Sequence, residues 1–272
     1  MNYLLARKAS ISAGLVVSSL KTVYSGDPLP KDAKTVFRWG CTSQLPDGLE
    51  VVNSVKAIHR VFDKGTFRHS LYRHELSMPT FLDFGDLLDV KAEGPWVVRP
   101  SEHQRSEDLH LCKTLKEVYQ TLKLSSMSKG YYISDYIQKT KEYRVFVCQN
   151  RVLAVVIKTP KDKSAVSWGC VTQGDFEYVP WSEWPLGVCQ SSLGALGLSG
   201  LTFGAVDVIE SSASIPYVLE VNTAPYLTPY YGKVLGKAFE YILKNGKADL
   251  KTKTESVSWK DLIHPAIHEG AL

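Results

Sequence analysis

Two neighbouring segments with acidic residues at matching positions constrain this chain most. Residues 203–210 and 217–225 are rich in Val, Ile, Leu and Tyr and alternate in polarity, so each is predicted to be a β-strand. The polar link between them, residues 211–216, is short enough for a hairpin turn. The sequence therefore predicts an antiparallel hairpin late in the chain.

Three oxygen-bearing side chains would share one face of this hairpin. Glu220 and Asn222 are two residues apart on one strand, and a link of this length permits Asp207 to lie opposite Glu220, with the carboxylates about 5 Å apart. Opposed like charges destabilise a hairpin unless a cation lies between them. An Asp, a Glu and an Asn oxygen suit magnesium, which keeps waters and also binds substrate phosphates. A sheet with a polar outer face would show the same spacing.

The order of these residues resembles the magnesium-binding end of the ATP-grasp superfamily. Residues 204–209 followed by 218–225 are similar to its strand, link and Glu-X-Asn motif, most closely to the ribosomal-protein glutamate ligase type. The resemblance implies that Asp207, Glu220 and Asn222 hold the Mg²⁺ ions that bridge the phosphates of ATP.

The same resemblance assigns two cations to the phosphates. Lys64 follows a helical pattern and precedes a proline-opened strand, as does a phosphate-binding lysine of the family; an exposed helix lysine is the alternative. Arg99 ends the apolar strand 95–100, where the family has another such lysine. An arginine can also bind phosphate, and through two hydrogen bonds.

Residues 131–137 alternate as a strand and resemble the hinge that binds adenine and ribose in the family. The resemblance implies this role for Asp135, Tyr136 and Ile137. Taken alone, the run is an ordinary half-buried strand.

A second predicted hairpin, formed by residues 141–147 and 152–158, carries Arg144 and Lys158. The resemblance implies that Arg144 steadies the acyl phosphate or the tetrahedral intermediate, and that Lys158 contacts phosphate or substrate. Cationic side chains of this kind commonly stabilise the charge on a phosphoryl group during its transfer. A salt bridge between Arg144 and Glu142, or another neighbour, is equally compatible with the sequence.

Residues 101–108 depart from the family. A glycine-rich loop is expected there, but this segment contains no glycine, so its backbone cannot approach phosphates as closely. His103 or Arg105 would have to supply side-chain contacts, or the loop would act as a substrate lid. The departure bears on catalytic competence rather than on the fold.

Composition limits the remaining possibilities. A chain of 272 residues with 44% hydrophobic content can bury a full core, and a net charge of only +4 requires neither a nucleic-acid nor a membrane partner. Five dispersed cysteines without a C-x-x-C pair argue against a disulfide framework and a zinc site. No run approaches the roughly 18 apolar residues of a membrane span. We therefore expect a soluble, cytoplasmic protein.

These observations predict an α+β protein of ATP-grasp type, with a small N-terminal α/β lobe and two α+β lobes that clasp the nucleotide between antiparallel sheets. The expected boundaries are 1–80 for the N-terminal lobe, 81–135 for the central lobe, 136–244 for the C-terminal lobe and 245–272 for a tail. Within the first lobe we expect strands at 3–6 and 35–39 and a helix near 12–21.

The predicted function is an ATP- and Mg²⁺-dependent carboxylate–amine ligase that forms an amide through an acyl phosphate. Its partners would be ATP, a carboxylate, and an amine from an amino acid, a peptide or a protein terminus. The alternatives are a non-ligating nucleotide-binding protein, serving as a sensor or assembly component, and a kinase of the same fold.

Overall fold

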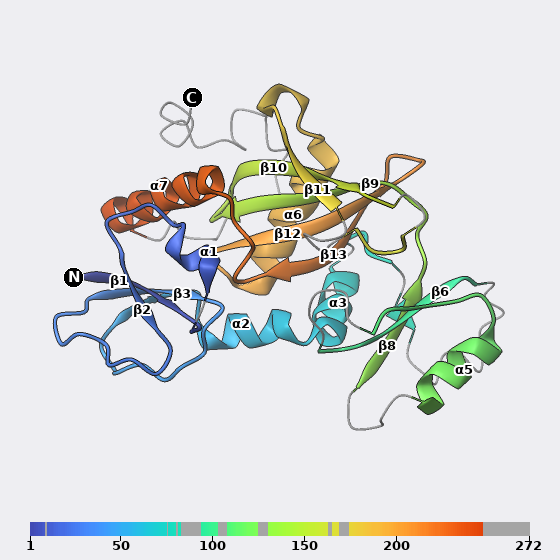
Figure 1. Ribbon diagram of the computed structural model, residues 1–272, viewed down its shortest axis with the longest axis horizontal. Helices are drawn as coiled ribbons and strands as arrows, with labels where there is room; N and C mark the ends of the chain where they lie inside the picture. The colour runs from blue at the N-terminus through green and yellow to red at the C-terminus, as the bar shows by residue number, and fades with distance from the viewer. Residues whose placement is uncertain are drawn as a thin grey trace.

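The computed structural model describes most of the chain in three lobes (Figure 1). It covers residues 1–8, 10–74, 76–79, 81–82, 94–102, 108–124, 130–162, 165–168 and 174–246, with the backbone alone at 81, 82, 124 and 174. His103, Arg105 and residues 247–272 of the expected tail lie outside the described residues. The structure mixes helices with parallel and antiparallel sheets, as expected for an α+β protein.

The N-terminal lobe contains a parallel four-stranded sheet of order β2-β1-β3-β4. Its strands are β1 (Asn2–Ala6), β2 (Lys21–Tyr24), β3 (Thr35–Trp39) and β4 (Glu50–Val52). Leu5 and Val36 pack under loops on one face, whereas Leu4 and Phe37 pack towards α7 (Pro229–Asn245) on the other.

The helix expected near residues 12–21 is wrong in extent. The helix α1 spans only Ile11–Gly14, and Lys21 already begins β2. The reason lies in the far end of the chain, because the backbone of Leu15 and Val17 runs directly against α7: the Val17 N–H donates to the carbonyl of Gly232 at 3.2 Å. This contact holds the segment out of a continued helix.

The C-terminal lobe is built on an antiparallel five-stranded sheet of order β11-β10-β9-β12-β13. Its strands are β9 (Lys139–Cys148), β10 (Arg151–Pro160), β11 (Gly174–Val179), β12 (Phe203–Ser211) and β13 (Pro216–Asn222). Three helices pack on one face of it: α2 (Val55–Phe62), α3 (Lys64–Arg73) and α6 (Leu186–Ser199). The helix α7 packs on the opposite face, against Phe146, Phe203 and Ala205. This apolar part of the sheet is therefore covered on both faces.

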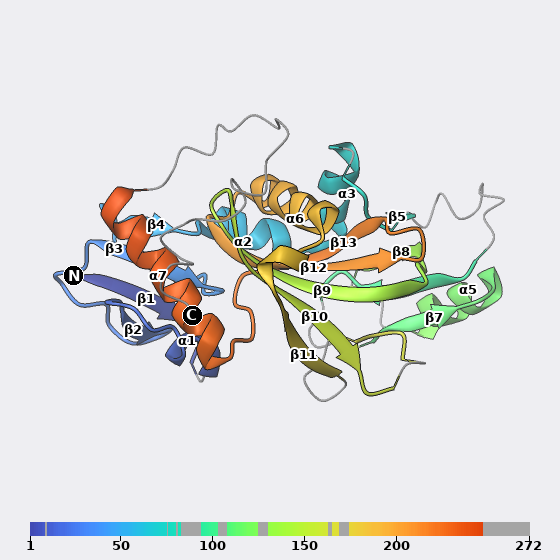
Figure 2. The ribbon, with the colours of Figure 1, turned by 90° about the horizontal axis from the view of Figure 1, so that it is seen from above.

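The central lobe carries a smaller antiparallel sheet of order β5-β8-β6-β7. Its elements are β5 (Phe81–Leu82), β6 (Trp96–Pro100), β7 (His110–Cys112), α5 (Leu115–Leu124) and β8 (Tyr131–Asp135). Thr114 caps α5, since its Oγ1 accepts the Glu117 N–H at 3.2 Å. In space the C-terminal sheet lies between the other two sheets, although it comes last in the chain (Figures 1 and 2).

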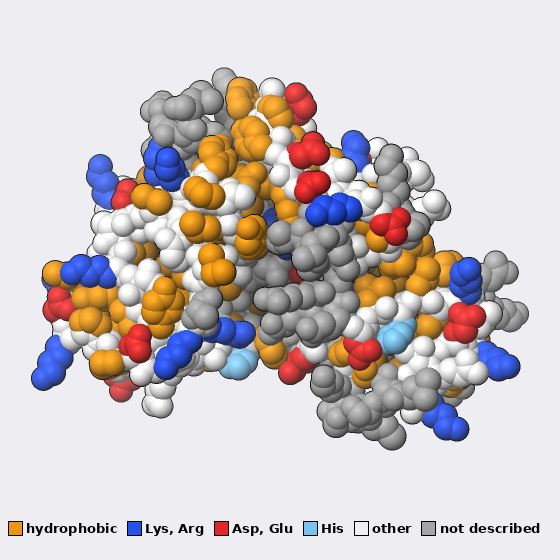
Figure 3. Space-filling model, in the orientation of Figure 1, with side chains coloured by type: hydrophobic (Ala, Val, Ile, Leu, Met, Phe, Trp, Pro, Cys, Tyr) orange, Lys and Arg blue, Asp and Glu red, His pale blue; other side chains and the backbone are white. Residues whose placement is uncertain are grey.

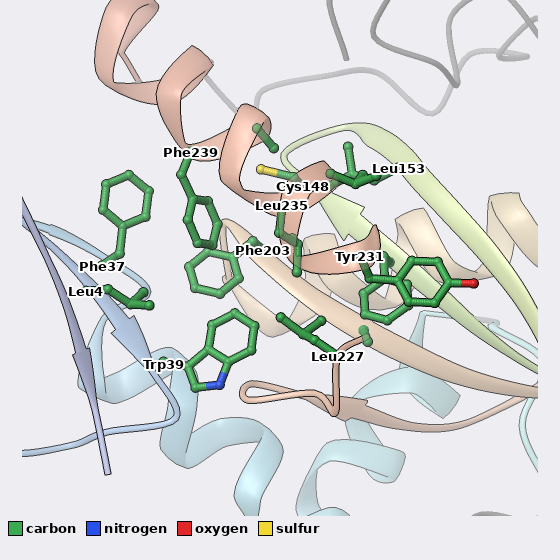
Figure 4. Close-up of a cluster of buried hydrophobic side chains, with 14 of the residues drawn as sticks. Leu4, Phe37, Trp39, Cys148, Leu153, Phe203, Leu227, Tyr231, Leu235 and Phe239 are labelled. Carbon is green, nitrogen blue, oxygen red and sulfur yellow. The ribbon is translucent and has the colours of Figure 1, made fainter. Parts of the chain in front are cut away.

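An aromatic core joins the N-terminal and C-terminal lobes (Figure 4). The ring of Phe239 on α7 lies 4.8 Å from that of Phe37 and 4.6 Å from that of Phe203, and Trp39 stacks on Phe203 at 5.8 Å. Such large buried rings supply much of the apolar burial that stabilises a fold. These two lobes therefore share one core, and α2 and α3, which the expected boundaries assign to the N-terminal lobe, pack on the C-terminal sheet. The boundaries themselves stay a prediction.

Two further expectations concern the surface and the cysteines. Cys41, Cys112, Cys148 and Cys189 are free and buried, whereas Cys170 lies outside the described residues. Among the helices that the structure describes, none is long and apolar enough to cross a membrane. Lys and Arg side chains are scattered among Asp and Glu over the face seen in Figure 3, rather than gathered in one basic patch.

Candidate active site

The register of the C-terminal sheet aligns charged residues across neighbouring strands. Arg144 on β9 pairs with Asp207 on β12, and Asp207 pairs with Glu220 on β13, a pairing that the predicted hairpin permitted. On this face of β12 the side chains are apolar at Phe203 and Ala205, where α7 covers them, and become charged at Asp207. One face of the sheet is therefore a core at one end and a charged site at the other.

Asp207 is buried and held by two cations. Arg144 donates through Nε and Nη2 to its two carboxylate oxygens, both at 2.8 Å, and Lys158 Nζ lies 3.0 Å from Oδ2. Burial by itself raises the pKa of Asp207, but Arg144 and Lys158 outweigh it and hold that pKa below the ordinary value of 3.8. The carboxylate thus stays ionised at any physiological pH. The salt bridge left open for Arg144 is formed with Asp207 and not with Glu142.

Glu142 forms the second buried part of the network. Its two carboxylate oxygens accept from Lys158 at 2.7 Å and from Lys139 at 2.5 Å. Burial opposes ionisation here as well, yet the two lysines hold the pKa of Glu142 below its ordinary value of 4.5. Lys158 therefore bridges Glu142 and Asp207 from β10, and it is almost fully buried.

Glu220 and Asn222 complete the predicted magnesium set. Asn222 Nδ2 lies 3.1 Å from Glu220 Oε1 and 3.4 Å from Asp207 Oδ2, so the three side chains converge on one point. Lys64, from the first turn of α3, donates to Glu220 Oε2. Two carboxylates and an amide fit a magnesium ion that keeps waters and phosphate oxygens as its other ligands. In the described ranges no three Asp, Glu, His or Cys side chains gather as a metal-binding group, so an all-protein cage does not fit.

Arg99 reaches the same region from the central lobe. It lies on β6 opposite Tyr132 of β8, and burial lowers the pKa of its guanidinium, although the negative charge of Glu220 acts in the other direction. Lys64 is tied to this lobe through its backbone, since its N–H donates to the Ser101 carbonyl at 3.2 Å. The two predicted phosphate-binding cations are thus brought to one carboxylate, Glu220.

The predicted hinge residues lie apart from this network. Asp135 ends β8, and Tyr136 and Ile137 lead into β9, so the three connect the central sheet to the C-terminal sheet. All are half-buried, and the Tyr136 N–H is already bonded to the Pro95 carbonyl at 3.0 Å. Within the described residues, no hydrogen bond or ion pair joins their side chains to the charged network.

Two residues in the site were missed from the sequence. Lys139 bonds to Glu142 and to the Val166 carbonyl and lies 4.5 Å over the ring of Trp168. Arg68 lies one helical turn after Lys64 and is 4% exposed. The spacing of four residues to Lys64 was the available signal, because residues so spaced share one face of a helix.

The central and C-terminal sheets are antiparallel, and the charged network lies where they meet, which is the arrangement expected of the ATP-grasp fold. No protein-family model matches the chain. It is 26% identical over 235 residues to the D-alanine–D-alanine ligase of Methylacidiphilum infernorum, covering 80% of this chain and 77% of the relative.

Solved structures with the same fold cover almost the whole chain. The crystal structure of D-alanine–D-alanine ligase from Bacillus anthracis matches with a TM-score of 0.62 at 15% identity, over 91% of this chain and 94% of that one. The ATP-grasp ligase PsnB, complexed with minimal precursor, Mg and ADP, matches with a TM-score of 0.65 at 14% identity, over 90% and 97%. The macrocyclase MdnC from Microcystis aeruginosa MRC, bound with precursor peptide MdnA, gives 0.60 at 14%, over 90% and 100%. The ATP-grasp fold predicted from the sequence is confirmed, and the likeness to glutamate ligases stays a prediction.

Proposed function

We propose that this protein is an ATP- and magnesium-dependent carboxylate–amine ligase. The observation that carries the proposal is the charge balance where the two antiparallel sheets meet. Three carboxylates, Asp207, Glu220 and Glu142, lie among six cationic side chains in the described part of the chain; the cations are Lys64, Arg68, Arg99, Lys139, Arg144 and Lys158. A surplus of buried positive charge is costly unless an anion joins it, and a triphosphate is such an anion.

Magnesium would be held by Asp207, Glu220 and Asn222. When bound, the metal would neutralise negative charge on the phosphates and orient them. Asn222 already contacts both carboxylates, and an amide can present its oxygen instead of its nitrogen by turning over. Lys64 and Lys158 would then exchange part of their contact with these carboxylates for phosphate oxygens.

The remaining side chains have distinct roles. Lys64 and Arg99 bind the phosphates from opposite lobes, and Arg144 with Lys158 holds the substrate carboxylate and the intermediate. Asp135, Tyr136 and Ile137 bind the nucleoside at the connection between the sheets. The position of these three between β8 and β9 supports this role, because a ligand there contacts both lobes.

The reaction has two steps. A carboxylate oxygen attacks the γ-phosphorus of ATP, the bond to the β-phosphate oxygen breaks, and an acyl phosphate and ADP form. The amine nitrogen then attacks the acyl carbon, phosphate leaves, and the nitrogen loses a proton as the amide forms. The buried cations stabilise the oxygen charges that develop in both steps.

The substrates are proposed only by class. The similar proteins include a D-alanine–D-alanine ligase, PsnB complexed with a minimal precursor, and MdnC bound with a precursor peptide, so an amino acid or a peptide is the first choice for the amine. A protein terminus, which the glutamate ligase likeness implies, is the second. The four cysteines that the structure describes are free and buried, which suits the reducing cytoplasm.

ADP release with a panel of carboxylates and amines tests the proposal. Formation of an amide by the natural protein, detected by mass spectrometry of cell extract incubated with protein, ATP and magnesium, is the expected result, with Asp207→Ala as the inactive control. A phosphorylated product without an amide would indicate a kinase. ATP binding without ADP release under any condition would indicate a non-ligating protein.

A further inference from the structure

Arg68 is buried with most of its guanidinium unused. Its Nη2 donates to the Leu219 carbonyl of β13 at 3.3 Å, and its guanidinium carbon lies 4.9 Å over the ring of Tyr132 on β8. Its Nε and Nη1 are buried and have no hydrogen-bond partner among the described residues. Leaving the buried donors of a charged group unpaired costs free energy, so an acceptor bound at these donors would be stabilising.

A second arginine, Arg99, also neighbours Tyr132. Arg99 pairs with Tyr132 across β6 and β8, and its Nε is also buried without a partner in the described part of the chain. Burial lowers the pKa of Arg99, and the nearby positive charge of Arg68 lowers it further. Two like charges beside one ring repel each other, and an anion between them would convert that repulsion into attraction.

The carboxylate of Glu220, whose charge acts on Arg99, already has partners of its own. Glu220 accepts from Lys64 and from Asn222, and it belongs to the proposed magnesium set. Arg68 instead contacts β13 through the main chain of Leu219. Since none of the described residues is an acceptor for Nε and Nη1 of Arg68 or for Nε of Arg99, we assign the acceptor to a ligand.

We propose that Arg68 is a phosphate-binding residue, which together with Arg99 binds a phosphate group of the nucleotide through the unpaired guanidinium donors. Identifying the anion as nucleotide phosphate rests on the proposed function. Arginine suits this role because its planar fork donates two parallel hydrogen bonds to one phosphate. Since Lys64 lies one turn earlier on α3, a single helix would present two cations to the phosphates.

The position of Arg68 has a mechanical consequence. Its guanidinium touches β8 of the central sheet and β13 of the C-terminal sheet at once. A phosphate bound there would fasten the two sheets to each other through α3. Arg68 would thus bind the nucleotide and hold the lobes in register.

Isothermal titration with adenosine, AMP, ADP and ATP, each with magnesium, tests this role. Arg68→Gln should weaken binding of ADP or ATP about tenfold to a hundredfold, as expected for a lost charged hydrogen bond, and leave adenosine within about twofold. Arg68→Lys should lose less, because it retains the charge without the fork. Arg73→Gln is the matched control, since Arg73 lies exposed on the same helix and its removal changes the net charge equally.

Each contrary result has a definite meaning. An equal loss for adenosine and ATP would show that Arg68 only packs on Tyr132, and an unchanged ATP affinity, or a raised KM for the acid substrate alone, would also overturn the proposal. If a thermal melt shows that Arg68→Gln does not fold, Arg68→Lys is tested instead. Weaker binding of ADP and ATP with unchanged binding of adenosine would support the proposal.

Two outcomes separate this inference from the proposed function. If the natural protein binds ATP but forms no amide, the ligase proposal fails, and a selective effect of Arg68 still stands. If it binds no nucleotide, titration with tripolyphosphate decides whether a phosphate site exists: binding that Arg68→Gln weakens keeps the site, and absence of binding overturns it.

Discussion

Arg144 binds both carboxylate oxygens of Asp207 through two hydrogen bonds of 2.8 Å, although the residues lie 63 positions apart in the chain. Their strands are neighbours in the sheet, and both side chains are buried. This buried ion pair therefore links two strands of the sheet and also belongs to the proposed active site.

Breaking this pair should destabilise the protein strongly. Arg144→Met leaves the buried charge of Asp207 with Lys158 and Asn222 alone, and we expect the free energy of unfolding in urea to fall by about 3 kcal/mol. The double variant with Asp207→Asn should recover part of that loss, because the orphaned charge is gone. Lys141→Met is the control: Lys141 is half-exposed and 3.5 Å from Glu210, and its loss should cost less than about 1 kcal/mol. Equal losses at both positions would contradict the buried-pair account.

Acid should weaken the fold through the same carboxylates. The pKa values of Asp207 and Glu142 lie below their ordinary values of 3.8 and 4.5, so each group binds fewer protons when folded than when unfolded. Their stabilising contribution is full above those ordinary values and is lost as pH falls through the lower folded-state pKa values. Urea titrations between pH 6 and about pH 2 should show this decline. Glu142→Gln should flatten it, whereas the exposed Glu183→Gln should not.

Glu220 should set the magnesium requirement. Glu220→Gln removes one of two proposed carboxylate ligands without changing the shape of the side chain, so the magnesium concentration for half-maximal ADP release should rise about tenfold or more. Glu210→Gln is matched to it, because Glu210 is on the same hairpin and pairs with Lys141 outside the site. An unchanged magnesium requirement in Glu220→Gln would remove this residue from the metal site.

Two glycines of α7 let the N-terminal segment cross at very short distance. A Cβ on Gly232 would lie 1.9 Å from the Leu15 carbonyl oxygen, and one on Gly236 would lie 1.8 Å from that of Val17. Because backbone cannot yield as a side chain can, Gly236→Ala should lower the free energy of unfolding by about 3 kcal/mol. In α6, Gly197 has open space around it, so Gly197→Ala should instead stabilise by up to about 1 kcal/mol. Thermal melts of both variants measure the contrast.

Asn53 joins the entry of α2 to the start of β12. It is 2% exposed and has a φ of +63°; its Oδ1 accepts the Thr202 N–H at 2.7 Å and its Nδ2 donates to the Phe203 carbonyl at 3.0 Å. Asn53→Ala should cost about 3 kcal/mol, because buried backbone groups lose their partners. Asn53→Gly should cost about 1 kcal/mol less, since glycine accepts the positive φ. Equal urea midpoints for the two variants would contradict the backbone contribution.

The sequence by itself determined what depends on neighbours along the chain. Alternation placed β3 at Thr35–Trp39, and the short link between β12 and β13 permitted an antiparallel hairpin with Asp207 opposite Glu220. The pairing itself depends on a register shift that the sequence did not indicate: the turn aligns Val208 with Val218, and a β-bulge between Asp207 and Val208 then brings Asp207 opposite Glu220. The order of motifs was enough to identify the ATP-grasp fold and to single out Arg144 and Lys158.

Only the tertiary structure decided which distant groups meet. Strand order brought Arg144 to Asp207 instead of Glu142, and the packing of α3 between two sheets buried Arg68. The tertiary structure also ended α1 at Gly14, because the backbone that follows hydrogen-bonds to α7. These contacts join residues that are far apart in the chain, through strand pairing, burial and close approach of backbone. A local sequence pattern therefore does not indicate them.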